Sequence, residues 1–389
     1  MSKFNKIKGE LLSYCQSEMN ELAIQYDLSG DFPEKSISKM RELKLLSSLI
    51  PEEYGGLGLT INEVGELCET LGMYCSSSAL IFAMHQMNVA CIVYGNDNEP
   101  FLDATLADIS KRQLLVCSAT SENGVGGNIR NSHCYVSREK RGFVLEKHCP
   151  IVSYGKYSDI WLITSKKSEA SNSGDQVISV LYAKQIELEQ KEKWNSFGFR
   201  ATCSDSFRVL AKAECQQIMR RPFSQILAEV MQPLSHALWS CVWLGMAKSA
   251  FNMTLESVRK RTLSNGGLNT THMKGAASID AKVQSMHAHC SYYLSEVSSK
   301  IGMVDDSPSA NLHNGVNFNN VKVVMSEYLI DIVSMCIKLS GMNAFNRDSE
   351  YCLERLLRDS YGAALMINNE RLTESNATYL LAISSNRLY

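Results

Sequence analysis

The chain has 389 residues, of which 45% are hydrophobic and 21% are charged, and its formal net charge at pH 7 is −2. The length suffices for two or three packed units with a sizeable core, and the composition is that of an ordinary globular protein. Because the charge is nearly balanced, it gives no support to a nucleic-acid-binding protein or to a protein held on an anionic membrane.

The cysteines and the hydropathy pattern indicate the compartment. There are thirteen cysteines, an odd number without a C-x-x-C pair, and the N-terminal MSKFNKIKGE has no signal-peptide core. These features predict reduced thiols in the cytoplasm. No apolar run approaches the length of a membrane span, so no membrane segment is expected.

The first region, from about Lys6 to Arg112, has the period of helices. The preceding PEEYGGLG, Pro51 to Gly58, predicts a glycine-rich turn before a helix with Asn62 as its cap. A further helix starts at Ser76 and includes His85, for which we expect a packing or capping role because no partner lies at metal-ligand spacing. The apolar stripe of the first helix, at i, i+3, i+4 and i+7, consists of Val64, Leu67, Cys68 and Leu71.

Near Gln113 the period changes to that of strands. Polar, glycine-containing loops separate short apolar runs, and residues 165–174 are typical of an exposed hairpin tip. After Phe223 the helical period returns and continues to the end, with a polar interruption at Asp305 to Ser309. We therefore expect an N-terminal helical domain (1–112), a central β domain (113–222) and a C-terminal helical domain (223–389). The predicted strands are Leu114–Ala119, Phe143–Leu145, Ile160–Thr164, Val177–Tyr182 and Phe207–Val209.

The late segment from Ile337 to Asp359 predicts a helix that ends in a loop at Gly341, followed by a helix that begins with charged residues. Its ERLLRD, Glu354 to Asp359, matches the P-x-E-R-x-x-R-D motif of the acyl-CoA dehydrogenase family. The PEEYGGLG turn also resembles that family's P-E-x-Y-G-G-x-G signature. The resemblance covers nearly the whole chain. It implies an α+β fold with a helical N-terminal domain, a central β-barrel or sandwich and a C-terminal four-helix bundle.

A glycine-rich loop, SATSENGVGGN, follows the first predicted strand. Small hydroxyl residues and glycines let backbone N–H groups approach an acceptor closely, although such a loop alone is a weak signal. The loop resembles the family's T-E-P-x-A-G-S-D loop, which lies along FAD. The resemblance implies one lost hydrogen bond, because Gly127 replaces a serine. It implies flavin contacts at Ser118, Thr120, Ser121, Gly126 and Gly127.

The segment PIVSYGKYSD resembles the family's second flavin element, W-I-T-N-G-G-x-A-D, with Pro150 and Val152 in place of Trp and Thr. Val152 has no side-chain donor, so flavin binding at this element would use backbone groups. The resemblance also implies that Arg261 reaches the flavin pyrophosphate of a neighbouring subunit, although the basic cluster Arg259 to Arg261 is by itself more typical of a solvated helix face. Further flavin contacts are implied for Lys338, Gly341 and Glu374.

Acyl-thioester dehydrogenation needs a carboxylate that removes the α-proton. The family holds it in a late I-Y-E-G-T loop or at the start of the long C-terminal helix, where this chain has Ser235 followed by His236. With a short insertion, Glu370 aligns with the late base and Glu374 with the second glutamate. Without the insertion, Ile367 takes the base position, and the two glutamates are a solvated i, i+4 pair.

These departures resemble a divergent branch of the family that oxidises acyl groups tethered to carrier proteins in polyketide, nonribosomal peptide and antibiotic biosynthesis, including hydroxymalonyl- and aminomalonyl-type extender units. There the oxidised carbon bears oxygen, so His236 or water can accept the hydroxyl proton. The leading hypothesis is therefore an FAD-dependent dehydrogenase of a carrier-tethered acyl thioester. One alternative is a conventional acyl-CoA dehydrogenase with Glu370 as base, and another is a non-catalytic structural paralogue.

The expected partners are an acyl carrier protein or CoA thioester substrate and further copies of the chain in a homodimer or homotetramer. The sequence does not identify the electron acceptor. No metal site is expected, because His287 and His289 fall at i, i+2 on a predicted helix, where side chains diverge.

Overall fold

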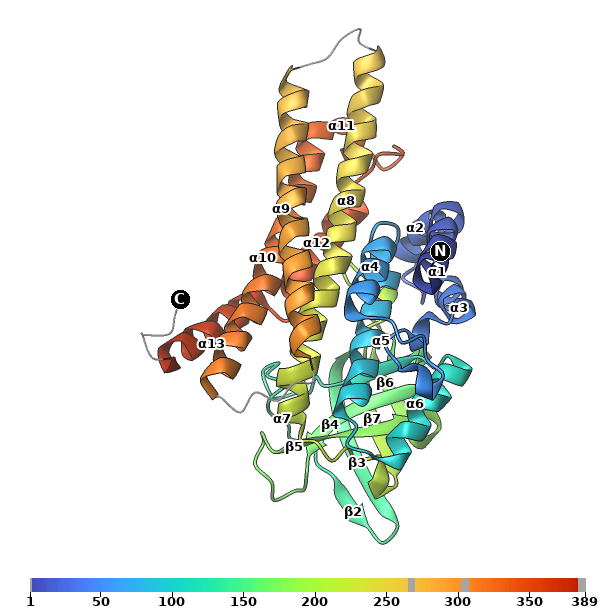
Figure 1. Ribbon diagram of the computed structural model, residues 1–389, viewed down its shortest axis with the longest axis vertical. Helices are drawn as coiled ribbons and strands as arrows, with labels where there is room; N and C mark the ends of the chain where they lie inside the picture. The colour runs from blue at the N-terminus through green and yellow to red at the C-terminus, as the bar shows by residue number, and fades with distance from the viewer. Residues whose placement is uncertain (1, 265–269, 302–307, 384–389) are drawn as a thin grey trace.

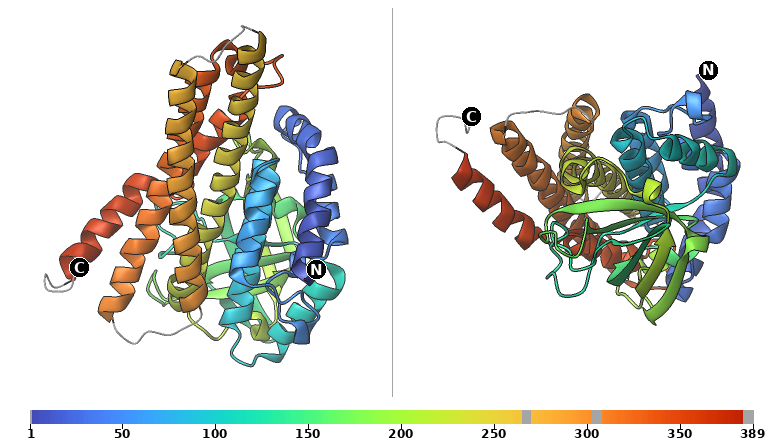
Figure 2. Two further views of the ribbon diagram at one scale, coloured as in Figure 1. Left: turned by 45° about the horizontal axis from the view of Figure 1, so that its top comes forward. Right: turned by 90° about the horizontal axis from the view of Figure 1, so that it is seen from below.

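The computed structural model describes residues 2–264, 270–301 and 308–383, and its elements follow the order helices, strands, helices (Figure 1). This order confirms the predicted fold class. The two termini lie on opposite sides of the molecule, because the last helix extends away from the bundle (Figure 2). Part of the predicted polar interruption, Asp305 to Ser307, lies outside the described residues.

Six α-helices form the N-terminal region. The fourth starts at a capping box in which Thr60 Oγ1 accepts from the Glu63 amide and the Glu63 carboxylate accepts from the Thr60 amide. Thr60, and not Asn62, is therefore the cap, because its side chain precedes the first helical turn. The helices are α1 (Lys3–Tyr14), α2 (Asn20–Ser29), α3 (Glu34–Glu42), α4 (Ile61–Gly72), α5 (Ser76–Gly95) and α6 (Pro100–Arg112).

Helix α5 is the centre of this region. It is long and apolar enough to cross a membrane, contrary to the expectation that no run reaches that length, but 89% of its most apolar window is buried inside the protein. His85 is fully buried on it, where Nε2 lies 2.7 Å from Leu46 O and Nδ1 accepts from the Val116 amide at 3.0 Å. His85 thus ties two chain segments together, which confirms its packing role.

The central region contains two sheets and not a closed barrel. One has the order β1-β4-β5, with β1 parallel to β4, and the other has the order β2-β3-β7-β6. The sequence analysis missed β2 and β6, because both are exposed and charged, and the apolar alternation in β6 is limited to Ile186 and Leu188. The strands are β1 (Val116–Ala119), β2 (Ser137–Glu139), β3 (Gly142–Val152), β4 (Ile160–Lys166), β5 (Gln176–Tyr182), β6 (Ile186–Glu192) and β7 (Asp205–Ala213).

Three long helices dominate the C-terminal region, and α4 packs on the first of them, α8 (Figure 1). The two axes approach closely because glycines meet carbonyls: a Cβ at Gly245 would overlap Glu69 O, and one at Gly72 would overlap Val242 O. The helices are α7 (Phe223–Ile226), α8 (Gln232–Ser264), α9 (Thr270–Lys300), α10 (Pro308–Ser340), α11 (Met342–Phe345), α12 (Glu354–Leu365) and α13 (Asn369–Ala382).

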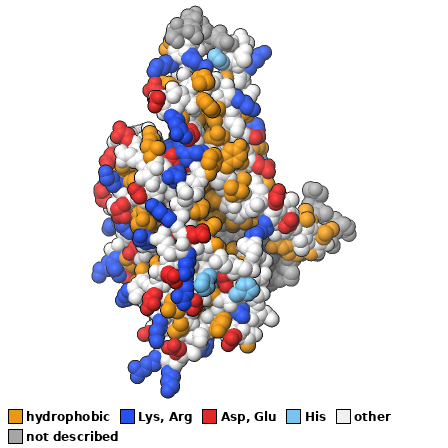
Figure 3. All heavy atoms as spheres, turned by 180° about the vertical axis from the view of Figure 1, so that it is seen from behind, with side chains coloured by type: hydrophobic (Ala, Val, Ile, Leu, Met, Phe, Trp, Pro, Cys, Tyr) orange, Lys and Arg blue, Asp and Glu red, His pale blue; other side chains and the backbone are white. Residues whose placement is uncertain are grey.

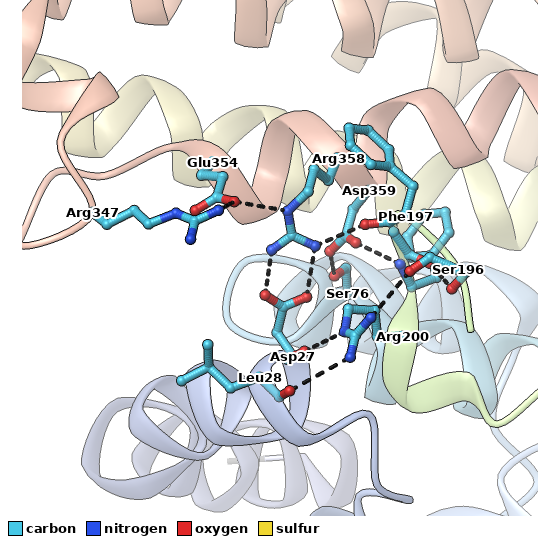
Figure 4. Close-up of polar contacts among 12 residues, drawn as sticks. Asp27, Leu28, Ser76, Ser196, Phe197, Arg200, Arg347, Glu354, Arg358 and Asp359 are labelled. Carbon is cyan, nitrogen blue, oxygen red and sulfur yellow. Dashed lines mark hydrogen bonds and ion pairs between the residues drawn. The ribbon is translucent and has the colours of Figure 1, made fainter. Parts of the chain in front are cut away.

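The ERLLRD motif starts α12 and fastens it to the other two regions (Figure 4). Arg358 forms a two-pronged ion pair with Asp27 of α2, and its Nη1 also donates to Phe197 O at 2.8 Å. The buried carboxylate of Asp359 accepts from Ser76 Oγ and, at 2.6 Å, from the Phe199 amide. A cavity of about 1090 Å³ lies beside this junction. The motif therefore fixes the start of α12 relative to both the helical and the β regions.

Candidate functional site

The first candidate surface is the end of β1. Ser118 and Thr120 alternate with buried residues, so their partly exposed hydroxyls share one face of the strand. Within the described residues neither hydroxyl has a hydrogen-bond partner, whereas Ser121 Oγ donates to Ile151 O at 2.6 Å. The strand thus presents two unpaired donors directly before the glycine-rich loop.

The loop after β1 exposes backbone groups. Gly124, Gly126 and Gly127 have φ values of 87°, 58° and 73°, which favour glycine over residues with a side chain. A Cβ at Gly126 would meet nothing within 4 Å, so open space lies in front of this residue. Glycine amides beside an open space are suited to an anionic or carbonyl acceptor.

A buried ionic cluster holds the base of this loop. The Glu122 carboxylate accepts from Ser132 Oγ at 2.6 Å and from the Cys134 amide at 2.7 Å. The fully buried Lys147 donates to Ala119 O at 3.0 Å and lies 3.8 Å from Glu122. Sequence reasoning missed Lys147, whose only signal is a lysine among the apolar residues of a strand. The cluster fixes the loop where it leaves β1.

In the second predicted flavin element, the segment PIVSYGKYSD, the exposed side chain is not at a position that the motif comparison identified. Val152 is fully buried in the core of the β region, so only its backbone can face a ligand. Ile151 is instead 50% exposed and lies beside Ser121. The side chain at this surface is therefore Ile151, which the motif comparison did not single out because it assigned the changed positions to Pro150 and Val152.

Together these groups fit a flavin. The unpaired hydroxyls of Ser118 and Thr120 suit the polar edge of its ring, the exposed Ile151 suits an apolar ring face, and the glycine amides suit a phosphate. No described group in the loop blocks the open space at Gly126. The residues present can therefore hold the cofactor that the sequence predicts.

The start of α13 lies against this loop. Arg371 Nη2 donates to Gly126 O, although 245 residues separate the two in sequence. Asn368 Oδ1 caps the helix by accepting from the Glu370 amide at 2.8 Å. Glu370 and Glu374 are both exposed on the first turns of this helix. The structure thus brings the predicted base segment to the predicted flavin loop.

A buried lysine holds the segment between α12 and α13. Lys322 Nζ of α10 donates to Ala364 O at 3.2 Å, to Ile367 O at 2.7 Å and to Asn369 Oδ1 at 2.7 Å. Burial lowers the pKa of Lys322 to about 7. Ile367 has a φ of 52°, a conformation that is unfavourable for a β-branched residue. The hydrogen bond from Lys322 to its carbonyl helps to retain that conformation.

His236 lies inside the helical bundle. Its ring has no exposed surface, its Nδ1 lies 2.9 Å from Phe318 O, and its Nε2 has no partner in the described chain. Burial lowers the pKa of His236 to about 4, so the ring is neutral at pH 7. Ser235 is also buried and donates to Gln232 O at 2.9 Å. This geometry favours a packing role for His236 over contact with a substrate.

The remaining predicted contacts gather at the far end of the bundle. Arg261 Nη2 donates to Leu339 O at 2.8 Å, and Gly341, with φ 64° and ψ −137°, follows within the same turn of chain. Lys338 is exposed in the last turn of α10. A cavity of about 470 Å³ opens here, lined by Lys260, Arg261, Asn343, Asp348, Ser349, Glu350 and Tyr351.

The flavin loop and this cavity lie at opposite ends of α8. Arg130, two residues after the glycine-rich loop, donates from Nη2 to Gln232 Oε1 at 3.1 Å and so places the loop near the start of the helix. At 1.5 Å per residue, Arg261 lies about 43 Å further along the same helix. One flavin cannot span that distance, so the two sets of predicted contacts cannot serve the same cofactor molecule within one chain.

Apolar side chains are exposed near the far end as well. Figure 3 shows hydrophobic side chains gathered over the helical bundle on the face opposite to that of Figure 1. Met342 and Phe345 of α11 are each more than 70% exposed. Large apolar side chains that are this exposed are typical of a surface that contacts another protein.

Comparison with known proteins agrees with this arrangement. The model of the acyl-CoA dehydrogenase N-terminal domain matches residues 4–99, and that of the acyl-CoA dehydrogenase C-terminal domain matches residues 237–367. The probable medium-chain specific acyl-CoA dehydrogenase 2, mitochondrial, of Caenorhabditis briggsae is 21% identical over 369 residues, which are 91% of this chain and 84% of that protein. The amino sugar nitrososynthase DnmZ of Streptomyces peucetius is 19% identical over 360 residues, 87% of this chain and 84% of that protein.

A solved structure shows the same fold. The FMN-bound crystal structure of TdsC, a dibenzothiophene monooxygenase from Paenibacillus sp. A11-2, superposes with a TM-score of 0.84 at 16% identity, over 97% of each chain. Both matched domains flank the β region that carries the loop, and the family cofactor is FAD, as the sequence predicts. The chain belongs to the acyl-CoA dehydrogenase family, whose members are flavin-dependent oxidoreductases.

Proposed function

We propose that the chain is an FAD-dependent oxidoreductase of an acyl thioester whose reacting carbon bears oxygen. One observation carries this proposal: in the alignment without an insertion, neither family base position holds a carboxylate. Ile367 stands at one, in a conformation that Lys322 helps to hold, and the buried Ser235 stands at the other. Without a base at these positions, removal of an α-proton is disfavoured, whereas an alcohol needs only an acceptor for its hydroxyl proton.

In this proposal the bound flavin supplies the hydride acceptor. The hydroxyls of Ser118 and Thr120 would donate to the ring edge, and Ile151 would cover part of an apolar face. Glu370 is exposed in the first turn of α13, and its neighbour Arg371 contacts the flavin loop. In this proposal Glu370 accepts the hydroxyl proton directly or through water. His236 takes no part in this step, because its ring is enclosed within the bundle.

The proposal includes a second copy of the chain. The cavity at Arg261 and Gly341 lies about 43 Å along α8 from the loop, so it would serve the flavin of a neighbouring subunit in a homodimer or homotetramer. The exposed Met342 and Phe345 of α11 lie near that end and would contribute apolar area to such an interface. We also propose a cytoplasmic location, in keeping with thirteen free cysteines of which eleven are buried.

For the acyl carrier we propose a carrier protein in a biosynthetic assembly line, acting on hydroxymalonyl- or aminomalonyl-type units. Support comes from the departures from the dehydrogenase motifs and from the similarity to a nitrososynthase that acts on an amino sugar, a family member outside acyl-CoA oxidation. The first test is to add acyl groups anaerobically to the flavin-loaded protein. Bleaching of the flavin by a 3-hydroxyacyl carrier protein, and not by butyryl-CoA, is the expected result.

The conventional dehydrogenase is tested by the same assay. Rapid bleaching with butyryl-CoA, abolished in Glu370→Gln, would replace our proposal by α-proton removal with Glu370 as base. With an alcohol substrate, Glu370→Gln should slow bleaching by at most about 10²-fold, because water can substitute for the carboxylate. A protein that binds no FAD after reconstitution would instead be a non-catalytic relative.

A second candidate function is oxygen-dependent oxygenation of the substrate. It is favoured by the hydrocarbon side chain at the base position, Ile367, together with the likeness to a monooxygenase and a nitrososynthase. Oxygen uptake by the pre-reduced protein distinguishes the two. Stoichiometric incorporation of labelled oxygen into the substrate would support oxygenation, whereas substrate oxidation without oxygen supports the dehydrogenase.

A further inference from the structure

The contact between Arg371 and the flavin loop has no counterpart in the family motif. In that motif a serine follows the glycine of the loop, and here Gly127 takes the place of the serine. The space that a side chain at position 127 would occupy is filled from another element, because a Cβ there would overlap Arg371 Nη1. A guanidinium from α13 therefore stands where the motif has a hydroxyl.

We propose that Arg371 is a cofactor-binding residue that holds the phosphate of the flavin at Gly126 and Gly127. This inference rests on the flavin part of the proposed function and on no assumption about the substrate. Arginine suits this role, because its planar fork can hold one oxygen acceptor and still direct further N–H groups at phosphate oxygens.

The hydrogen-bonding state of Arg371 supports this assignment. Only Nη2 is engaged, by Gly126 O, and the described residues offer no acceptor to Nε or Nη1. No carboxylate in the described chain lies within ion-pair distance of it, although Glu370 and Glu374 are on the same helix. The guanidinium is therefore an uncompensated positive charge with free donors at an open glycine loop.

The position of Arg371 on its helix also supports its assignment as a phosphate-binding residue. It lies in the first turn of α13, behind the Asn368 cap, where a positive side chain opposes the helix dipole. An anion bound between the glycine amides and the guanidinium would offset that unfavourable placement. Ser118, in β1, and Thr120, directly after it, precede the glycines in the chain, so the flavin ring would lie at the end of the strand and the phosphate at the loop.

The proposal is tested by titrating the flavin-free protein with FAD, FMN and riboflavin and measuring binding by flavin fluorescence. Arg371→Gln should weaken FAD and FMN binding on the order of tenfold to hundredfold, the range for hydrogen bonds to a charged group, and should leave riboflavin binding unchanged. Arg371→Lys, which keeps the charge without the fork, should lose less. Arg141→Gln, an equal charge change at the exposed turn between β2 and β3, is the matched control and should bind all three ligands as the wild type does.

The results that would overturn the inference can be told apart in the same titrations. Equal FAD affinity in the wild type and Arg371→Gln would overturn the inference, and so would an equal loss for riboflavin, which would mean that Arg371 acts only on the shape of the loop. Unchanged flavin binding with weakened binding of a malonyl-type thioester would move the residue to substrate recognition and overturn it as well. Failure of the wild type to bind FAD would refute the proposed function together with the inference.

Discussion

The two ends of α12 differ in how completely their polar groups are satisfied. At its start, Arg358 is paired with Asp27, and both oxygens of Asp359 accept hydrogen bonds (Figure 4). After its end, Ile367 has a positive φ and Arg371 keeps unpaired donors beside an open loop. The start is the part that matches the family motif best. The closest motif match therefore marks a structural junction, and the features that bear on chemistry lie where the match fails.

The largest effect that we expect is a loss of stability when the ion pair at the start of α12 is broken. Asp27→Ala removes the two-pronged partner of the Arg358 guanidinium, which is only 14% exposed, and leaves it Glu354, whose Oε1 lies 3.4 Å from Arg358 Nε. The change should cost about 3 kcal/mol of the free energy of unfolding, the lower end of the range for a broken buried pair, because one carboxylate remains. Urea denaturation measures this loss. The matched control is Glu52→Ala, which breaks the exposed ion pair with Lys3 and should cost less than about 1 kcal/mol. Equal losses in the two variants would mean that the junction is no more important than a surface pair.

A second prediction concerns His236, which is enclosed and satisfied at one nitrogen only. Burial lowers its pKa from 6.5 to about 4 in the folded chain, so between these values the unfolded chain binds the proton and the folded chain does not. The wild type should therefore lose about 3 kcal/mol of stability, attributable to this residue, as the pH falls from 6.5 to 4. His236→Asn should lose that much less over the same range in urea titrations. Parallel curves would show that the ring is not enclosed in solution.

Periodicity predicted the order helices, strands, helices because it reflects which residues are buried, and the resemblance to the family implied the fold class. The helices and the five apolar strands were found for this reason, whereas the exposed β2 and β6 have no buried face to produce a pattern. In the candidate site, spacing and motif located the row from Ser118 to Gly127. They could not show that the side chain of Val152 points into the core while Ile151 is exposed, because the strand pairing shifts register between Cys149 and Val152.

Contacts between distant segments were beyond the reach of sequence patterns. Lys322 is separated from Ile367 by 45 residues and Arg371 from Gly126 by 245, and neither pair belongs to one helix or one strand ladder. A lysine inside an apolar stretch of α10 is a weak signal by itself, because most such side chains extend to solvent. The fold predicts that the segment after α12 approaches the β region, but only the structure identifies the atoms that meet.

A third prediction concerns Lys322, whose three hydrogen bonds hold the segment that follows α12. Lys322→Met removes three partly buried hydrogen bonds and should cost about 1–3 kcal/mol at pH 7. Burial lowers the pKa of Lys322 from 10.5 to about 7, so the wild type should gain stability relative to the variant as the pH rises from 7 towards 10.5. Urea denaturation at pH 7 and pH 9 measures both effects. A stability difference that stays constant between the two pH values would show that the amine remains charged when folded.

The smallest expected effect is that of removing the cap of α13, and it tests whether this cap positions Arg371 for the cofactor. Asn368→Ala removes the side-chain cap of α13 and should cost about 1 kcal/mol, as should Ser2→Ala at the cap of α1. The two variants are matched in stability, but only the first loosens the turn that carries Arg371. FAD binding should therefore weaken a fewfold in Asn368→Ala, less than in Arg371→Gln, and should stay unchanged in Ser2→Ala. If both cap variants bind FAD equally well, the first turn of α13 does not set the position of the guanidinium, and the loop alone must retain it.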